Sequence, residues 1–161
     1  MDHKTKKWVS KEAALAKLQR YCAYQDRCHQ EVRNKLLDLG IYGEDLEDII
    51  AELITEGFLN EERFARSFVR GKYRMKQWGR TRIRQELKVR KISDYCIRKG
   101  LEEVDEQEYL EILQRLLEKK AEQLTGGTSF EKNTKLYQFA LRRGFESELI
   151  ATTLKELLQD S

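Results

Sequence analysis

The amino-acid sequence predicts an all-α protein made of three tandem three-helix repeats that resemble helix-turn-helix units. Three observations predict this fold class. The 161 residues include no proline, which breaks helix interiors, and they are rich in good helix formers such as Leu, Glu, Lys, Arg and Ala. Apolar residues recur in steps of three and four, which keeps them on one face of a helix. A pattern of apolar positions also returns three times along the chain.

The repeat becomes visible when three segments are aligned on Gly40, Lys91 and Gly144, which lie 51 and 53 residues apart. Six positions at fixed distances from each anchor are apolar in all three segments. All 18 positions are therefore apolar, whereas a composition of 40% hydrophobic residues gives about seven. Glycine after a helix relieves the left-handed conformation of its C-terminus, so each anchor is expected to end a helix.

The first repeat is expected at residues 10–58, after an N-terminal tail at residues 1–9. Its first helix is expected at Lys11–Tyr24, and a second helix ends before Gly40. Acidic residues follow and favour the start of a third helix, because negative charge stabilises a helix N-terminus. The sequence leaves open whether Trp8 packs onto this repeat or lies in a disordered end.

The second repeat is expected at residues 59–104 and the third at residues 105–161. Their first helices are expected at Glu61–Lys76 and Asp105–Gln123, each with an apolar stripe. We interpret Gly126-Gly127 as a flexible loop between helices. A unit of roughly 50 residues buries little surface alone, so neighbouring units should stack, into either an extended crescent or a closed bundle.

The net charge of +3 conceals a strong pattern along the chain. Residues 41–62 carry eight acidic side chains and no basic one, whereas residues 63–100 carry 14 basic and two acidic side chains. Residues 101–125 return to eight acidic and three basic side chains. A basic block between two acidic blocks bears on the partners of a protein rather than on its fold.

The basic block predicts two stripes of charge on consecutive helices. Because a helix turns about 100° per residue, four basic residues on each helix fall within about 80° of one another, on faces separate from the apolar stripes. Tyr73 and Trp78 lie nearby and are expected to stack on bases or on a partner, while Arg82 and Arg90 add charge. The predicted binding surface consists of Arg63, Arg66, Arg70, Lys72, Arg74, Lys76, Arg80, Arg84, Lys88 and Lys91.

Two interpretations of this surface stay open at the level of sequence. The cations either bind a partner, through phosphate groups or an acidic protein surface, or form a solvated face that the acidic segments balance. The excess of 14 cations over two anions favours binding. The acidic helix at residues 44–62 is interpreted as a solvated face, with pairing to the basic unit as the alternative.

Catalysis is not expected from these residues. His3 and His29 lack metal-ligand spacing, the three cysteines form no CxxC pair, and Gly126-Gly127 lacks the context of a phosphate-binding loop. We therefore expect no catalytic residue, no metal and no cofactor. The sequence has no signal peptide and no membrane-spanning apolar run, and its odd cysteines fit reducing conditions, so we expect a cytoplasmic protein without a membrane partner.

Two stretches carry a more specific signal. Residues 56–70 read EGFLNEERFARSFVR, and residues 79–92 read GRTRIRQELKVRKI. Together with the threefold repeat, they resemble the bacterial RecX family, whose members regulate the RecA recombinase. The family usually has glycine where Lys91 stands, so this turn is either capped in another way or strained. The matching positions are Arg33, Lys35, Leu36, Leu37 and Gly40 in the first unit, and Asn60, Glu61, Arg63, Phe64, Ala65, Phe68, Val69, Arg70, Ile83, Glu86 and Leu87 in the second.

The resemblance, which covers residues 11–160, implies a monomeric regulator of DNA repair, recombination and the SOS response. Such a protein would bind the RecA recombinase filament, lie along its groove beside single-stranded DNA, and inhibit its ATPase and strand-exchange activity. The second unit is expected to dominate the contact. The alternatives are a DNA-binding transcription regulator that uses a helix-turn-helix unit, a protein scaffold without DNA dependence and, last, an enzyme.

Overall fold

The computed structural model describes residues 9–159 of the chain, so Trp8 and its packing lie outside the described residues. Within this range the chain forms nine helices and no strand, in three successive three-helix units. This confirms the predicted all-α fold of tandem repeats. The first unit contains α1 (Lys11–Tyr24), α2 (His29–Asp38) and α3 (Gly43–Thr55); the second contains α4 (Glu61–Arg74), α5 (Arg80–Val89) and α6 (Asp94–Leu101); the third contains α7 (Glu106–Gln123), α8 (Ser129–Arg142) and α9 (Ser147–Gln159).

The first helix of every unit begins with the same kind of cap. The side chains of Ser10, Asn60 and Asp105 each accept a hydrogen bond from a backbone N–H three residues later, at 3.1, 2.8 and 3.1 Å. Each cap satisfies a donor that the helix leaves unpaired and contributes about 1 kcal/mol. Short polar residues before each apolar stripe therefore set where the units start.

The three anchors of the repeat end the second helix of their units, as the sequence predicts. Gly40 and Gly144 adopt left-handed conformations with φ of 82° and 97°. Lys91 adopts the same conformation with φ of 60°, although it carries a Cβ atom. The strained alternative for this turn is therefore the correct one.

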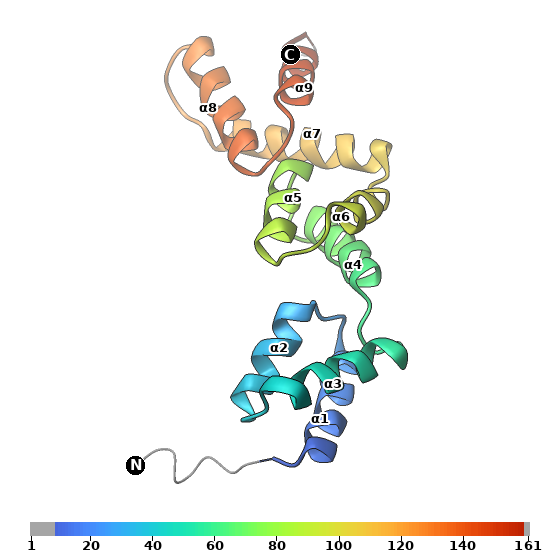
Figure 1. Cartoon of the computed structure of the whole chain (residues 1–161). Helices are drawn as coiled ribbons and strands as arrows, with labels where there is room; N and C mark the ends of the chain where they lie inside the picture. Colours follow the sequence, from blue (N-terminus) through green and yellow to red (C-terminus); the bar gives the residue numbers. More distant parts are fainter. Residues whose placement is uncertain (1–8, 160–161) are drawn as a thin grey trace, which may run out of the picture.

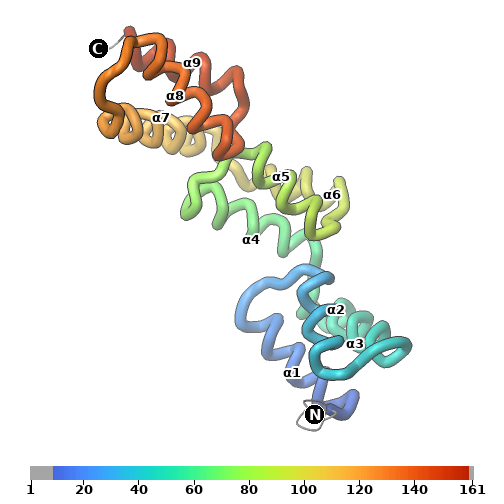
Figure 2. The backbone as a smooth tube through the Cα atoms, turned by 90° about the vertical axis from the view of Figure 1, so that its left-hand side faces the viewer, coloured from blue at the N-terminus to red at the C-terminus, as the bar shows by residue number. Residues whose placement is uncertain are grey.

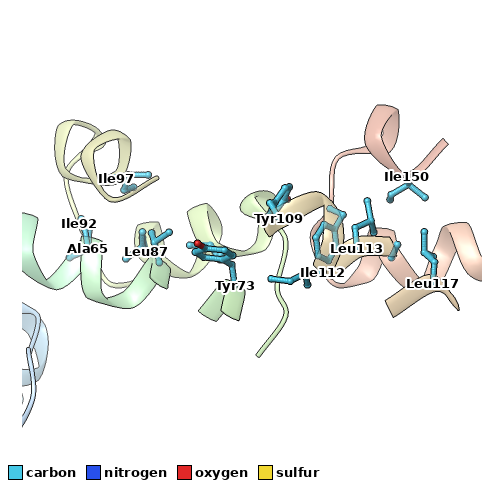
Figure 3. Packing of buried hydrophobic residues seen from close by; sticks show 14 of the residues in the cluster. Ala65, Tyr73, Leu87, Ile92, Ile97, Tyr109, Ile112, Leu113, Leu117 and Ile150 are labelled. Atoms are coloured by element: carbon cyan, nitrogen blue, oxygen red, sulfur yellow. The ribbon is translucent and has the colours of Figure 1, made fainter. Parts of the chain in front are cut away.

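The apolar core is divided into two clusters, which decides the overall shape. One fills the first unit around Leu18, Leu36 and Leu53. The other runs through the second and third units, where Tyr73 and Tyr109 lie between the two ends of the row (Figure 3). All major helix–helix contacts join helices of the same unit, and α1 and α9 lie at opposite ends of the array (Figures 1 and 2). The described chain is extended, and the closed-bundle alternative is wrong.

The second and third units are joined backbone to backbone. The N–H of Gly79 donates to the Arg143 carbonyl at 2.7 Å, and the N–H of Thr81 donates to the Gly144 carbonyl at 3.0 Å. These bonds connect the start of α5 to the turn between α8 and α9. Since the apolar cluster is also continuous across this junction, the two units pack as one body.

The first unit is joined to the second mainly through Arg63. Its Nε binds the carboxylate of Asp26 at 2.8 Å, and its terminal nitrogens donate to the carbonyls of Gly57 and Phe58. Cys28, at the start of α2, is buried in the cluster of the second unit. One guanidinium thus ties the α1–α2 connection to the α3–α4 connection.

The acidic helix α3 makes its ion pairs inside the first unit. Asp48 binds Lys11 at 2.8 Å, and Glu47 binds Arg33 at 2.7 Å. In the described residues, α3 forms no ion pair with the basic unit, so the alternative that the two pair with each other is wrong. Across residues 9–159, no helix combines the length and the apolar character that crossing a bilayer requires.

Candidate nucleic-acid interface

The arginines of α4 face the acidic segment that links the second unit to the third. Arg66 binds Glu103 at 2.7 Å, and Arg70 binds the other oxygen of the same carboxylate at 2.8 Å. Arg74 binds Glu108 at 3.0 Å. These hydrogen bonds, first from Arg70 and then from Arg66, lower the pKa of the Glu103 carboxyl. The predicted stripe exists, but its charge is balanced within the chain.

Arg80 also has an internal role. Its Nε binds Glu146 at 2.7 Å, another of its nitrogens pairs with Glu106, and its guanidinium lies 4.2 Å from the centre of the Tyr109 ring. The Tyr109 hydroxyl accepts the backbone N–H of Arg80 at 2.9 Å and donates to Glu146 at 2.6 Å. Burial, followed by the bond to Glu146, raises the pKa of Tyr109. This network clamps the start of α5 to α7 and to Glu146, the residue before α9.

The structure therefore divides the ten predicted binding residues into two groups. Five carry internal ion pairs: Arg63, Arg66, Arg70, Arg74 and Arg80. In the part of the chain that the structure describes, no ion pair involves the other five, which are Lys72, Lys76, Arg84, Lys88 and Lys91. The second group supplies the charge that an external partner can reach.

A cluster of cations and aromatic rings lies where α4 meets α5. Lys72 Nζ is 5.2 Å from the centre of the Phe68 ring and 4.9 Å from that of Trp78. Arg82 lies 4.1 Å from Trp78, and Arg90 lies 4.8 Å from Phe68. Each cation gains from the negative face of a ring while part of its surface stays open to solvent.

The electrostatics of this cluster favour an anion. Burial, and then repulsion from Lys76, Arg90 and Arg82, lowers the pKa of Lys72. The pKa of Arg143, directly after α8, is also lowered, by burial and by repulsion from Arg82. Among the described residues, these cations form one ion pair, between Arg90 and Glu86 at 3.0 Å. Cations that repel one another bind phosphate well, because the bound anion relieves the repulsion.

The two aromatic residues singled out in the sequence differ in the structure. Trp78 is partly exposed and carries Lys72 and Arg82 on its ring. Tyr73 is fully buried, and its hydroxyl donates to Glu108 at 2.7 Å, so the expectation that it stacks on bases is wrong. Phe68 is only half-buried and belongs to the cationic cluster as well as to the core. The sequence could have indicated this role of Phe68, because it lies four residues before Lys72 and residues four apart contact each other on a helix.

Other reactive groups give no second site in the described part of the chain. Cys22, Cys28 and Cys96 are buried free thiols, and burial raises the pKa of the first two. Among residues 9–159, no group of three His, Cys, Asp or Glu side chains lies together as a metal site requires. The cationic cluster at α4 and α5 is therefore the candidate site.

Comparisons with known proteins agree with this architecture. The family model described as "RecX, second three-helix domain" matches residues 60–101, and the one described as "RecX, third three-helix domain" matches residues 106–154. The regulatory protein RecX of Prosthecochloris aestuarii is 31% identical over 138 residues, which make up 86% of this chain and 89% of that protein. The regulatory protein RecX of Bacillus mycoides is 27% identical over 137 residues, and the aligned region spans 51% of its length.

The fold of this chain also matches that of a solved structure. The crystal structure of RecX from Lactobacillus salivarius matches this chain with a TM-score of 0.82 and 27% identity, over 91% of this chain and 96% of that one. Two family models thus cover the second and third units, and one relative is similar over nearly its whole length. The chain belongs to the RecX family of regulatory proteins.

Proposed function

We propose that this protein regulates the RecA recombinase by binding its filament on single-stranded DNA and inhibiting its ATPase and strand-exchange activity. The relatives are named regulatory proteins, which supports a regulatory role. The observation that carries the proposal is the surplus of cations at Lys72, Arg82 and their neighbours on an extended helical array. A filament of protein and DNA offers both phosphate groups and a long groove to such a surface.

The arrangement of the units supports a docking role rather than chemistry. The second and third units form one body through the Gly79 and Arg143 backbone bond and the Arg80 clamp. A rigid surface loses little conformational entropy when it binds, so most of the free energy of its contacts contributes to affinity. Binding along a groove would hold neighbouring recombinase subunits in one arrangement and oppose the changes that ATP turnover requires.

The decisive experiment measures DNA-dependent ATP hydrolysis by RecA on single-stranded DNA, titrated with this protein at two salt concentrations. We expect inhibition at protein concentrations well below that of RecA, and we expect higher salt to relieve it because phosphate contacts release counterions. Unchanged hydrolysis in the presence of folded protein would contradict the proposal. Sequence-specific binding to duplex DNA without any recombinase would instead support the helix-turn-helix regulator.

A further inference from the structure

The first unit contains a second cluster of cations and aromatic rings. The Arg27 guanidinium lies 3.7 Å from the centre of the Tyr21 ring and 5.9 Å from that of Tyr24. Lys35 Nζ lies 5.5 Å from the Tyr21 ring. Tyr24 is 83% exposed, which leaves its ring open to a partner.

The third unit contains a third cluster of the same chemistry. Lys120 from α7 lies 5.2 Å from the centre of the Phe139 ring in α8, and Arg143 lies 5.8 Å from the same ring. Each of the three clusters is therefore formed by residues of the first two helices of its unit and of the turns that follow them. None of them includes a residue of α3, α6 or α9.

The first two clusters are in register with the repeat. Tyr21 and Arg27 lie 51 residues before Lys72 and Trp78, which is the distance between the anchors Gly40 and Lys91. Tyr21 corresponds to Lys72, and Arg27 corresponds to Trp78. The order of the aromatic residue and the cation is therefore reversed, but both units contain such a pair. The α1–α2 and α4–α5 connections, which contain Arg27 and Trp78, both lie on the left of the array in Figure 2. The guanidinium of Arg143, in the third cluster, donates to the backbone carbonyls of Gln77 and Lys76, so this cluster lies beside the second one.

The charge of the three clusters is strongly unbalanced. They contain seven cations, and only two ion pairs join these cations to carboxylates in the described residues. These are Arg27 with Glu31, at 4.0 Å, and Arg90 with Glu86, at 3.0 Å. Aromatic faces hold the cations in place, so binding an anion costs them little side-chain entropy.

We infer that the three clusters form one continuous track for single-stranded nucleic acid, with the cations on the phosphates and Tyr24 available to stack on a base. A strand carries phosphates at short regular intervals and can follow a row of sites, whereas an acidic protein patch would have to match all three positions at once. The inference deepens the proposed function, on which its biological setting rests: the track contacts the DNA of the filament, and other surfaces contact the recombinase.

The test measures binding of a fluorescein-labelled oligothymidylate, long enough to span the three units, by fluorescence anisotropy without recombinase. The variant Lys35→Gln/Lys72→Gln/Lys120→Gln removes one cation from each cluster. The control Lys11→Gln/Arg98→Gln/Lys155→Gln removes the same charge from residues that face α3 or lie on α6 and α9. Circular dichroism confirms that both variants are folded, and a Lys→Arg version of the first should restore binding.

We expect the track variant to bind about 100-fold more weakly at about 0.1 M salt, because each phosphate contact on a single strand contributes about 0.7 to the slope of log K against log salt. The slope itself should fall by about two, and the control should change neither quantity. Equal weakening in both variants, or no binding by the unaltered protein at low salt, overturns the inference.

The two proposals fail separately. If the track variant keeps its oligothymidylate affinity but loses inhibition of ATP hydrolysis, the clusters contact recombinase protein and the track is refuted, while the proposed function stands. If oligothymidylate binding behaves as expected but ATP hydrolysis by RecA is unaffected, the track stands and the proposed function is refuted.

Discussion

Gly79 and Gly144 pack backbone to backbone at the junction of the second and third units: a Cβ atom on Gly79 would lie 2.2 Å from the carbonyl carbon of Gly144. Real Cβ atoms do not approach backbone so closely, and no flexible side chain is available to move. The same contact carries the Gly79 to Arg143 hydrogen bond. The junction therefore requires glycine at this position.

Gly79→Ala should lower the free energy of unfolding by about 1–3 kcal/mol, the usual effect of overpacking, and loosen the second unit from the third. Gly71→Ala is the matched control, because nothing lies within 4 Å of a Cβ atom there and the residue is inside α4. That variant should gain about 0.5–1 kcal/mol. Urea denaturation of both variants checks the prediction. Equal free energies of unfolding in the two variants would contradict it.

Lys91→Gly should stabilise the protein by about 1 kcal/mol, because a residue with a Cβ atom is strained in the left-handed conformation at φ of 60°. Lys88→Gly removes the same charge from inside α5 and should instead destabilise by about 1 kcal/mol. Thermal unfolding distinguishes the two. A loss of stability in Lys91→Gly would show that the lysine makes a compensating contact.

The division of the predicted surface gives a direct test on inhibition. Arg84→Gln/Lys88→Gln removes two exposed cations and should keep the unfolding free energy within about 0.5 kcal/mol. If both contact phosphates, the concentration for half-inhibition of RecA ATP hydrolysis should rise about 25-fold at about 0.1 M salt.

Arg66→Gln/Arg70→Gln removes the same charge but leaves Glu103 without its two partners. This variant should lose a little stability, because ion pairs exposed to solvent contribute weakly, and it should inhibit normally while folded. A larger loss of inhibition in this variant than in Arg84→Gln/Lys88→Gln would indicate that the arginines of α4 bind the partner.

The unfolding free energy should decrease in acid because of Glu103 and Glu108. Hydrogen bonds from Arg70 and Arg66 lower the pKa of Glu103, and those from Tyr73 and Arg74 lower the pKa of Glu108, below the ordinary 4.5. A carboxyl with a lowered folded-state pKa stabilises the fold above its unfolded pKa, and this contribution disappears as pH falls through the folded pKa.

The expected loss therefore begins near the ordinary pKa of 4.5 and continues below it. Urea denaturation across this range measures it. Glu103→Gln should show a smaller dependence of the unfolding free energy on pH, because one of the carboxyls with a lowered pKa is gone. Glu111→Gln, at an exposed position of α7, is the control and should keep the full dependence. An unchanged dependence in Glu103→Gln would contradict the assignment.

The helices and the ends of the units follow from the sequence because their causes are local. Caps such as Asn60 act three residues away, and the glycine anchors act within one turn. The sequence also determines the repeat, since apolar positions at fixed distances require only a helical period. Comparison with Gly40 and Gly144 left the turn at Lys91 open between another cap and a strained conformation, and only the structure showed that it is left-handed.

The tertiary structure decided which cations are available. Arg66 and Glu103 lie 37 residues apart, and a helical wheel gives the face of an arginine but not the carboxylate that a distant segment of the chain brings to it. The same holds for Arg80 and Glu146, which lie 66 residues apart, and for the choice of an extended array. Ion pairs and unit packing depend on how helices meet in space. The sequence determined the basic block, and the packing of the units decided which part of it faces solvent.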